Sequence, residues 1–120
     1  RASGVATSAK ISFFDICNLE EFVSTISFTE ILEDLLATGA FVSSHSWGSS
    51  SFGEYTEYDS EADNFLFMNP EALIFTSAGN MGEYGPFSVG SPAVSKNVLT
   101  VGSSGNSASR FGPGLPYVSY

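Results

Sequence analysis

The chain has 120 residues, of which 42% are hydrophobic and 14% charged, and its net charge is −9 from 13 acidic and 4 basic residues. This composition is enough for one modest domain with a core and excludes a disordered chain. The excess of acidic residues argues against binding to nucleic acid or to an anionic membrane surface, because both require clustered Lys and Arg. No apolar run approaches the ~20 residues of a membrane-spanning helix, and the single cysteine, Cys17, cannot form a disulfide within these residues.

The predicted elements begin with a strand and a long amphipathic helix. Residues 10–16 form a mostly continuous apolar run rich in Ile and Phe, which predicts a strand covered on both faces. Apolar side chains then recur at helical spacing through residues 19–38, with acidic residues mostly between them. Asn18 is the expected N-cap of this helix, and Gly39 is its expected stop.

A short helix and three further strands follow. The helix is predicted over residues 60–68, with Ser60 or Asp59 as its N-cap and an Asn-Pro pair at its end. The three strands are the apolar runs 40–44, 73–77 and 97–102. The alternation of strands and helices predicts an α/β domain with a parallel β-sheet, flanking helices and right-handed crossovers.

Polar loops follow two of the predicted strands. In an open parallel sheet, ligands bind beyond the carboxyl ends of the strands. The loops at those ends begin at Ser46 and at Ala78, so the two most distinctive stretches of the sequence are expected at the same edge of the sheet.

The hexapeptide Ser77-Ala78-Gly79-Asn80-Met81-Gly82 lies where the third strand ends. Gly79 permits either unusual backbone dihedrals or the close approach of another backbone. Asn80 places a neutral amide donor there, which would stabilise the oxyanion of acyl transfer more than the uncharged substrate. The alternative is an asparagine tolerated in a left-handed turn, and the hexapeptide taken alone favours that alternative.

Two other stretches also have a plain and a functional interpretation. Ser46-Trp47-Gly48-Ser49 is either an ordinary Ser/Gly turn or a loop against which a peptide backbone lies, because Gly48 has no side chain. Residues 90–104 contain Ser91-Pro92 in a turn before a strand, where a cis bond is one option.

Together and in this order, the motifs resemble the catalytic domain of subtilisin-like serine proteases (peptidase family S8). The family patterns GVAP-A-l, SxG, AAGN-G and PA-nVitVGA correspond here to Gly4-Val5-Ala6-Thr7-Ser8-Ala9-Lys10-Ile11, Ser46-Trp47-Gly48-Ser49, Ser77-Ala78-Gly79-Asn80-Met81-Gly82 and residues 92–103. The match covers nearly the whole chain. The resemblance implies a three-layer α/β/α fold, of which residues 1–120 would be an internal, partial segment of one catalytic domain with no second domain.

The resemblance also implies roles for individual residues. Asn80 would be the catalytic side-chain donor of the oxyanion hole in a serine endopeptidase that hydrolyses polypeptides through an acyl-enzyme. The walls of the pocket for the substrate residue before the scissile bond would be Ser46, Trp47, Gly48, Ser49, Ala78 and Gly79. Gly90 would lie near its floor, and the Ser91-Pro92 bond would be cis.

No residue of the catalytic triad is assigned within the chain. Subtilisins carry Asp, His and Ser in that order, and the resemblance places the first two motifs before residue 1 and the third after residue 120. His45, the only histidine, is followed by Ser-Trp-Gly rather than by a Gly-Thr-His pattern, so it is expected to be a packed or hydrogen-bonded residue beside the cleft. The segment alone is therefore expected to be inactive.

Two rival functions are weighed against this one. A non-catalytic relative that only binds peptides would differ in the flanking triad motifs. A nucleotide-binding domain is disfavoured, because Gly79, Gly82 and Gly85 do not have the G-x-G-x-x-G spacing and no Gly-Lys-Ser/Thr occurs.

The acidic stretch 54–65 has the alternation of a calcium loop at Asp59, Glu61 and Asp63, but it lacks the Gly and the Glu of an EF-hand at their positions. We expect a solvated acidic loop that caps a short helix, with a charge that would favour basic substrates. No metal ligand is assigned and the chemistry requires no cofactor; the family resemblance allows structural calcium at a site that the sequence does not identify. The resemblance also favours a secreted or extracellular location.

Overall fold

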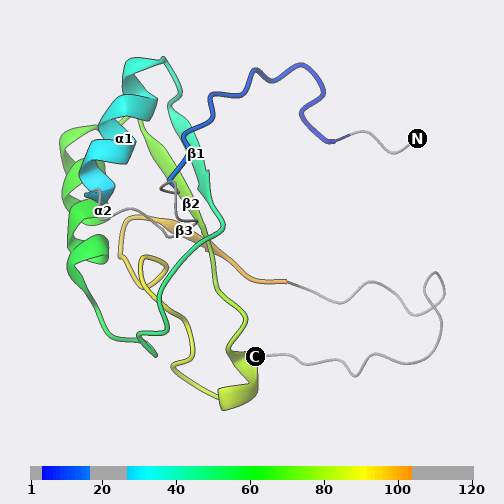
Figure 1. Cartoon of the computed structure of the whole chain (residues 1–120), viewed down its shortest axis with the longest axis vertical. Helices are drawn as coiled ribbons and strands as arrows, with labels where there is room; N and C mark the ends of the chain where they lie inside the picture. The colour runs from blue at the N-terminus through cyan, green and yellow to red at the C-terminus, as the bar shows by residue number, and fades with distance from the viewer. Residues whose placement is uncertain (1–3, 17–26, 104–120) are drawn as a thin grey trace, which may run out of the picture.

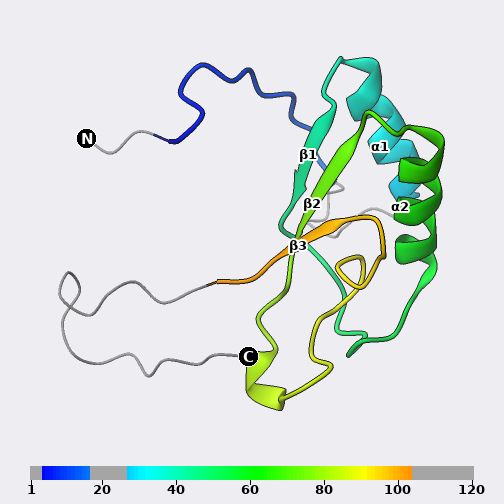
Figure 2. The same cartoon turned by 180° about the vertical axis from the view of Figure 1, so that it is seen from behind.

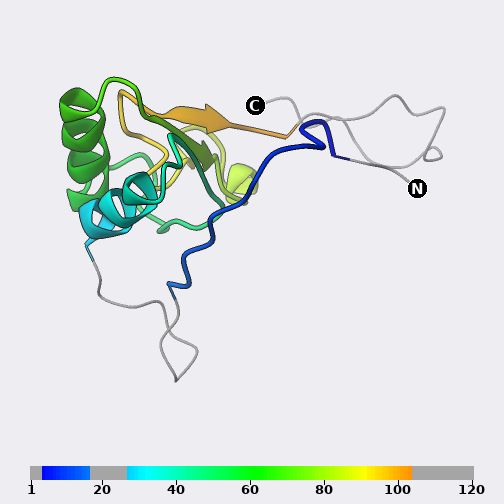
Figure 3. The same cartoon turned by 90° about the horizontal axis from the view of Figure 1, so that it is seen from above.

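The computed structural model describes residues 4–16 and 27–103. Its elements in chain order are α1 (Phe28–Ala37), β1 (Val42–His45), α2 (Glu57–Met68), β2 (Leu73–Ser77), the short 3-10 helix η1 (Gly82–Tyr84) and β3 (Leu99–Val101). The strands form one parallel sheet in the order β1-β2-β3, and both α-helices lie on the same side of it (Figures 1 and 3). The predicted α/β class with a parallel sheet is confirmed.

The core lies between the two helices and one face of the sheet. Because side chains alternate along a strand, Ile74 and Thr76 of β2 point together toward the helices, and both are buried. The buried apolar cluster consists of Phe28, Ile31 and Leu32 from α1, Ala62 and Phe65 from α2, and Ile74. Burial of each large apolar side chain contributes roughly 1.5–3 kcal/mol, so this contact is what fixes the helices on the sheet.

The opposite face of the sheet is apolar as well. Val42, Leu99 and Val101 share this face in the observed register and are 62%, 49% and 54% exposed. Among the described residues, no helix covers it (Figure 2). The described part of the chain therefore supplies two of the three layers that the family resemblance implies.

The first helix ends where the sequence predicts and the second begins earlier. α1 ends at Ala37, and Gly39, at φ +85°, donates its N–H to the carbonyl of Leu36 at 2.9 Å. α2 begins at Glu57 with Thr56 as its N-cap, so the predicted caps Ser60 and Asp59 are wrong. The reason is a capping box: the Asp59 side chain, at the third position of the helix, accepts the backbone N–H of the N-cap Thr56. The predicted start of the first helix at residue 19 is wrong, because α1 begins at Phe28 with the non-helical Ser27 as its N-cap, and Glu61 of α2 accepts the Thr29 N–H of its first turn at 3.0 Å. Asn18 and Cys17 lie outside the described residues.

The strand predicted over residues 10–16 is not formed. The described sheet consists of β1, β2 and β3 alone, and residues 10–16 form no strand of it (Figure 1, blue). Ile11 and Phe13 are 89% and 85% exposed. Only Phe14 and Ile16 pack against the core. Apolar content predicts burial, but a strand also needs a neighbour that pairs with its backbone groups.

The other strands agree with prediction to within two residues at each end. β2 has the predicted bounds, whereas β1 is shifted toward the C-terminus and β3 is shorter than predicted. Neither α-helix of the described residues has the length and hydropathy needed to cross a membrane.

Candidate functional site

The loops after β1 and β2 leave the same end of the sheet (Figure 1). Residues of these loops line a cleft of about 290 Å³. Its lining includes all eight residues predicted for the site, which are Ser46, Trp47, Gly48, Ser49, Ala78, Gly79, Asn80 and Gly90. The parallel sheet explains this juxtaposition, since it places the carboxyl ends of β1 and β2 side by side. The geometric expectation that Asn80 and the chain near Trp47 border a common groove therefore holds.

Sequence reasoning missed four lining residues. Ser50, Ser77 and Met81 adjoin the predicted stretches, so a wider window would have included them. Ser88 also lines the cleft, and no motif marks it. None of the lining residues carries a charged side chain.

The turn after β2 presents Asn80 to the cleft. Ala78 continues the strand pairing by donating its N–H to the carbonyl of Val101 at 3.0 Å. Gly79 then adopts φ +92°, and no atom lies within 4 Å of where its Cβ would stand. Asn80 is exposed, and within residues 4–16 and 27–103 its side-chain amide has no hydrogen-bond partner. The turn expected on the plain interpretation is present at Gly79, and the amide donor expected on the functional interpretation is present at Asn80, so the two interpretations do not exclude each other.

The loop Ser46–Ser49 is held against the segment Gly90-Ser91 by backbone contacts. Ser49 donates its N–H to the carbonyl of Ser91 at 2.9 Å. A Cβ on Gly48 would stand 2.8 Å from the Ser91 carbonyl oxygen, and a Cβ on Gly90 would stand 1.9 Å from that of Ser49. Gly48 is therefore required by contact within the protein, a reason that differs from the predicted approach of a peptide.

These backbone contacts give a testable prediction. We expect Gly90→Ala to destabilise the fold by about 3 kcal/mol or more, because a backbone carbonyl occupies the Cβ position and one of the two loops must move. The matched control is Gly102→Ala, whose Cβ would meet nothing within 4 Å. Thermal unfolding of both variants measures the difference, and equal midpoints would contradict it.

A buried polar network supports the floor of the cleft. The Ser91-Pro92 bond is cis, as predicted, and both residues are buried. Ser91 Oγ lies 2.6 Å from Thr56 Oγ1, and the Thr56 hydroxyl donates in turn to the fully buried Asp59 at 3.1 Å. Asp59 Oδ1 also accepts from the Ser95 hydroxyl at 3.1 Å. The start of α2 is thereby joined to the segment that carries Gly90.

The acidic stretch 54–65 is mostly helix rather than the solvated loop that we expected. Asp63 accepts the Tyr55 hydroxyl at 2.7 Å and the backbone N–H groups of Asn97 and Lys96 at 2.8 and 3.2 Å. Burial alone would raise the pKa of Asp63, but these hydrogen bonds outweigh it and lower that pKa. Among the described residues no group of three His, Cys, Asp or Glu side chains is placed to hold a metal ion.

His45 is the packed residue that the sequence indicates. It is 6% exposed, its ring meets Phe28 edge-to-face at 4.9 Å, and its Nδ1 lies 3.3 Å from Trp47 Nε1. Burial lowers the pKa of His45 from 6.5 to about 4, because the charged ring would lose its hydration. The ring is therefore neutral at pH 7, and its pKa lies well below that of a general base working at neutral pH.

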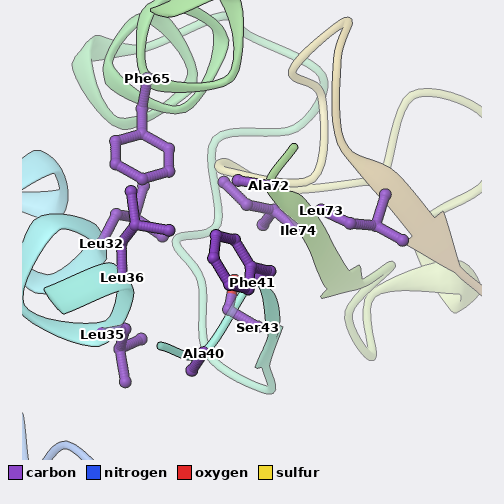
Figure 4. Close-up of a pocket in the computed structure, with 10 residues that line it drawn as sticks. All are labelled: Leu32, Leu35, Leu36, Ala40, Phe41, Ser43, Phe65, Ala72, Leu73 and Ile74. Atoms are coloured by element: carbon purple, nitrogen blue, oxygen red, sulfur yellow. The ribbon is translucent and has the colours of Figure 1, made fainter. Parts of the chain in front are cut away.

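A second, much smaller gap lies in the core between α1, α2 and the sheet (Figure 4). Its volume is about 10 Å³, roughly what one water molecule needs. Phe65 of α2 points toward Leu32 of α1, and the remaining labelled side chains are almost all apolar. This gap is a packing feature, whereas the cleft between the loops is far larger, at about 290 Å³.

Comparison with known proteins decides the family. A model of the subtilase family (Peptidase_S8) matches residues 1–118. The chain belongs to the subtilase family. The resemblance read from the motifs is confirmed, and subtilase membership supports a function of the serine-protease type.

Two curated relatives of this subtilase come from Dictyostelium discoideum. The chain is 38% identical over 107 residues to the serine protease/ABC transporter B family protein tagD and 37% identical over 105 residues to the protein tagB of the same description. Each alignment covers 83% of this chain. The subtilase chain spans only 6% and 5% of the length of these relatives.

Proposed function

We propose that residues 1–120 are an internal part of the catalytic domain of a serine endopeptidase, supplying the oxyanion-hole donor and the substrate loops. One observation carries this proposal: the unpartnered amide of Asn80 and the loop Ser46–Ser49 border the same cleft. Family membership supports the reaction type. The Asp, His and Ser of the triad are not assigned within these residues.

The proposed chemistry depends on where charge develops. During attack on a peptide carbonyl, its oxygen becomes an oxyanion, and a preorganised neutral donor stabilises that state more than the substrate. The amide of Asn80 makes no hydrogen bond to the described residues, so it can donate to the oxyanion without first breaking one. The cleft walls at Ser46–Ser49 and Ala78–Asn80 would hold the substrate on either side.

We expect the cleft to accept an uncharged substrate side chain. Its lining has no charged residue, and the acidic residues of 54–65 are not part of it. An arginine or glutamate placed there would lose hydration without gaining an opposite charge. The value of kcat/KM for peptides with Phe or Leu before the scissile bond should exceed that for Arg or Glu by at least ~10-fold. A preference for Arg would instead support the earlier hypothesis of basic substrates.

The full-length protein tests the proposed activity. We expect covalent labelling by a fluorophosphonate reagent and cleavage of a Phe-containing peptide, both abolished by prior treatment with phenylmethylsulfonyl fluoride. A protein that binds the peptide but is neither labelled nor active would be the non-catalytic, peptide-binding relative.

A further inference from the structure

His45 ends β1 as a buried polar residue that the proposed catalytic chemistry does not use. Its Nε2 is buried and has no hydrogen-bond partner among the described residues. A buried polar group without a partner is unfavourable for folding. An apolar side chain at this position would avoid that penalty, so packing alone does not explain the imidazole.

The imidazole supplies one thing that an apolar side chain lacks, a hydrogen-bond acceptor for Trp47. Trp47 Nε1 lies 3.3 Å from Nδ1 of His45. An indole N–H can only donate, so Nδ1 must be the acceptor and the proton of the neutral ring must be on Nε2. Burial keeps the ring in this neutral form. Nε2 is then left without a partner because Nδ1 is the nitrogen that accepts the Trp47 N–H.

Trp47 contacts this buried ring and two further aromatic side chains. Its indole is half-buried and meets Phe28 at 5.0 Å and Tyr58 at 5.6 Å, both edge-to-face. These contacts restrain the position of the indole, and the hydrogen bond to His45 restrains its rotation as well. Trp47 is also one of the residues that line the cleft, so a ring held in one orientation keeps this part of the lining in one shape.

We propose that His45 is a positioning residue, which fixes the Trp47 ring as a rigid aromatic wall for a large uncharged side chain of an extended peptide. The inference rests on the proposed function only in that a peptide occupies the cleft. The hydrogen bond orders the wall before the peptide arrives, so less freedom is lost on binding. His45 acts through Trp47 and does not itself touch the peptide.

Two substitutions of His45 separate this role from simple packing. His45→Leu removes the acceptor and the unpartnered nitrogen together, whereas His45→Asn keeps an oxygen acceptor near the place of Nδ1. The probe is a fluorescein-labelled hexapeptide with Phe before an N-methylated, uncleavable scissile amide, bound to the full-length protein and followed by fluorescence anisotropy. The unmodified peptide gives kcat and KM.

We expect His45→Leu to weaken peptide binding by roughly 5- to 10-fold and to raise KM with little change in kcat. His45→Asn should bind within ~2- to 3-fold of the wild type. In a Trp47→Phe background, which has no indole N–H, His45→Leu should have no further effect. Thermal midpoints of the variants show that each is folded.

Three results would overturn the proposal: wild-type affinity in His45→Leu, equal weakening in His45→Asn and His45→Leu, or an undiminished effect in the Trp47→Phe background. A wild type that binds the uncleavable peptide but does not cleave the unmodified one would refute the proposed activity alone, and the binding series would still decide the role of His45. Absence of peptide binding by the wild type would overturn both.

Discussion

Replacement of Asn80 by alanine is expected to lower kcat by about 10²–10³ with little change in KM, the magnitude known for the corresponding asparagine of subtilisin. The physical reason is that the donated hydrogen bond strengthens only when the substrate oxygen becomes an oxyanion. Asn80 is exposed and its side chain bonds to none of the described residues, so its loss should not disturb folding. Steady-state kinetics on a peptide amide measures the effect.

Two further variants sharpen this test. Asn80→Asp keeps the shape but replaces the donor by a negative charge, so it should reduce kcat at least as much as Asn80→Ala. Asn64→Ala removes an exposed asparagine on α2, outside the cleft lining, and should leave kcat unchanged. If Asn80→Ala hydrolysed a peptide amide as fast as the wild type, the residue would have no part in the chemistry.

The cleft was predictable because its residues lie in short local patterns. Gly79 and Asn80 follow directly from a strand, and so does Ser46, so the rule for parallel sheets was enough to bring them together. Gly90 was assigned to the same site by the family resemblance and not by a local pattern. The same locality explains why the class of fold and the position of β2 were correct.

Features that depend on distant partners were not predictable from the sequence. Gly90 lies close to the Ser49 carbonyl although the two residues are about forty positions apart, and no local sequence pattern indicates this contact. The segment 10–16 has the composition of a strand but is not one of the three strands of the described sheet. Asp59 was interpreted as solvated, although it is fully buried by groups that follow it much later in the sequence.

Replacement of Asp59 by alanine is expected to destabilise the folded domain by about 3 kcal/mol. Its carboxylate accepts the backbone N–H of Thr56 at 2.8 Å, the Thr56 hydroxyl at 3.1 Å and the Ser95 hydroxyl at 3.1 Å. Alanine leaves the Thr56 N–H without this acceptor at a site that is 0% exposed, and it removes the capping box of α2. The Ser95 hydroxyl keeps the Pro92 carbonyl at 2.7 Å and the Thr56 hydroxyl keeps Ser91 Oγ at 2.6 Å, so the N–H and the capping box account for most of the loss. Differential scanning calorimetry of the full-length protein should show a midpoint lower by roughly 10 °C in the transition of this domain.

Two further substitutions test whether the buried hydrogen bonds of Asp59 or only its negative charge stabilise the domain. Asp59→Asn keeps one acceptor oxygen, which can still receive Thr56 while the bond from Ser95 is lost, so it should cost only about 1 kcal/mol. Glu57→Gln removes a charge from the same first turn of α2 at an exposed position, where the helix dipole effect is only about 0.3–1 kcal/mol. Equal losses in Asp59→Ala and Glu57→Gln would mean that the charge near the helix end matters and the buried hydrogen bonds do not. A loss confined to Asp59 would show that the bonds behind the cleft floor hold α2 and the Ser91 segment together.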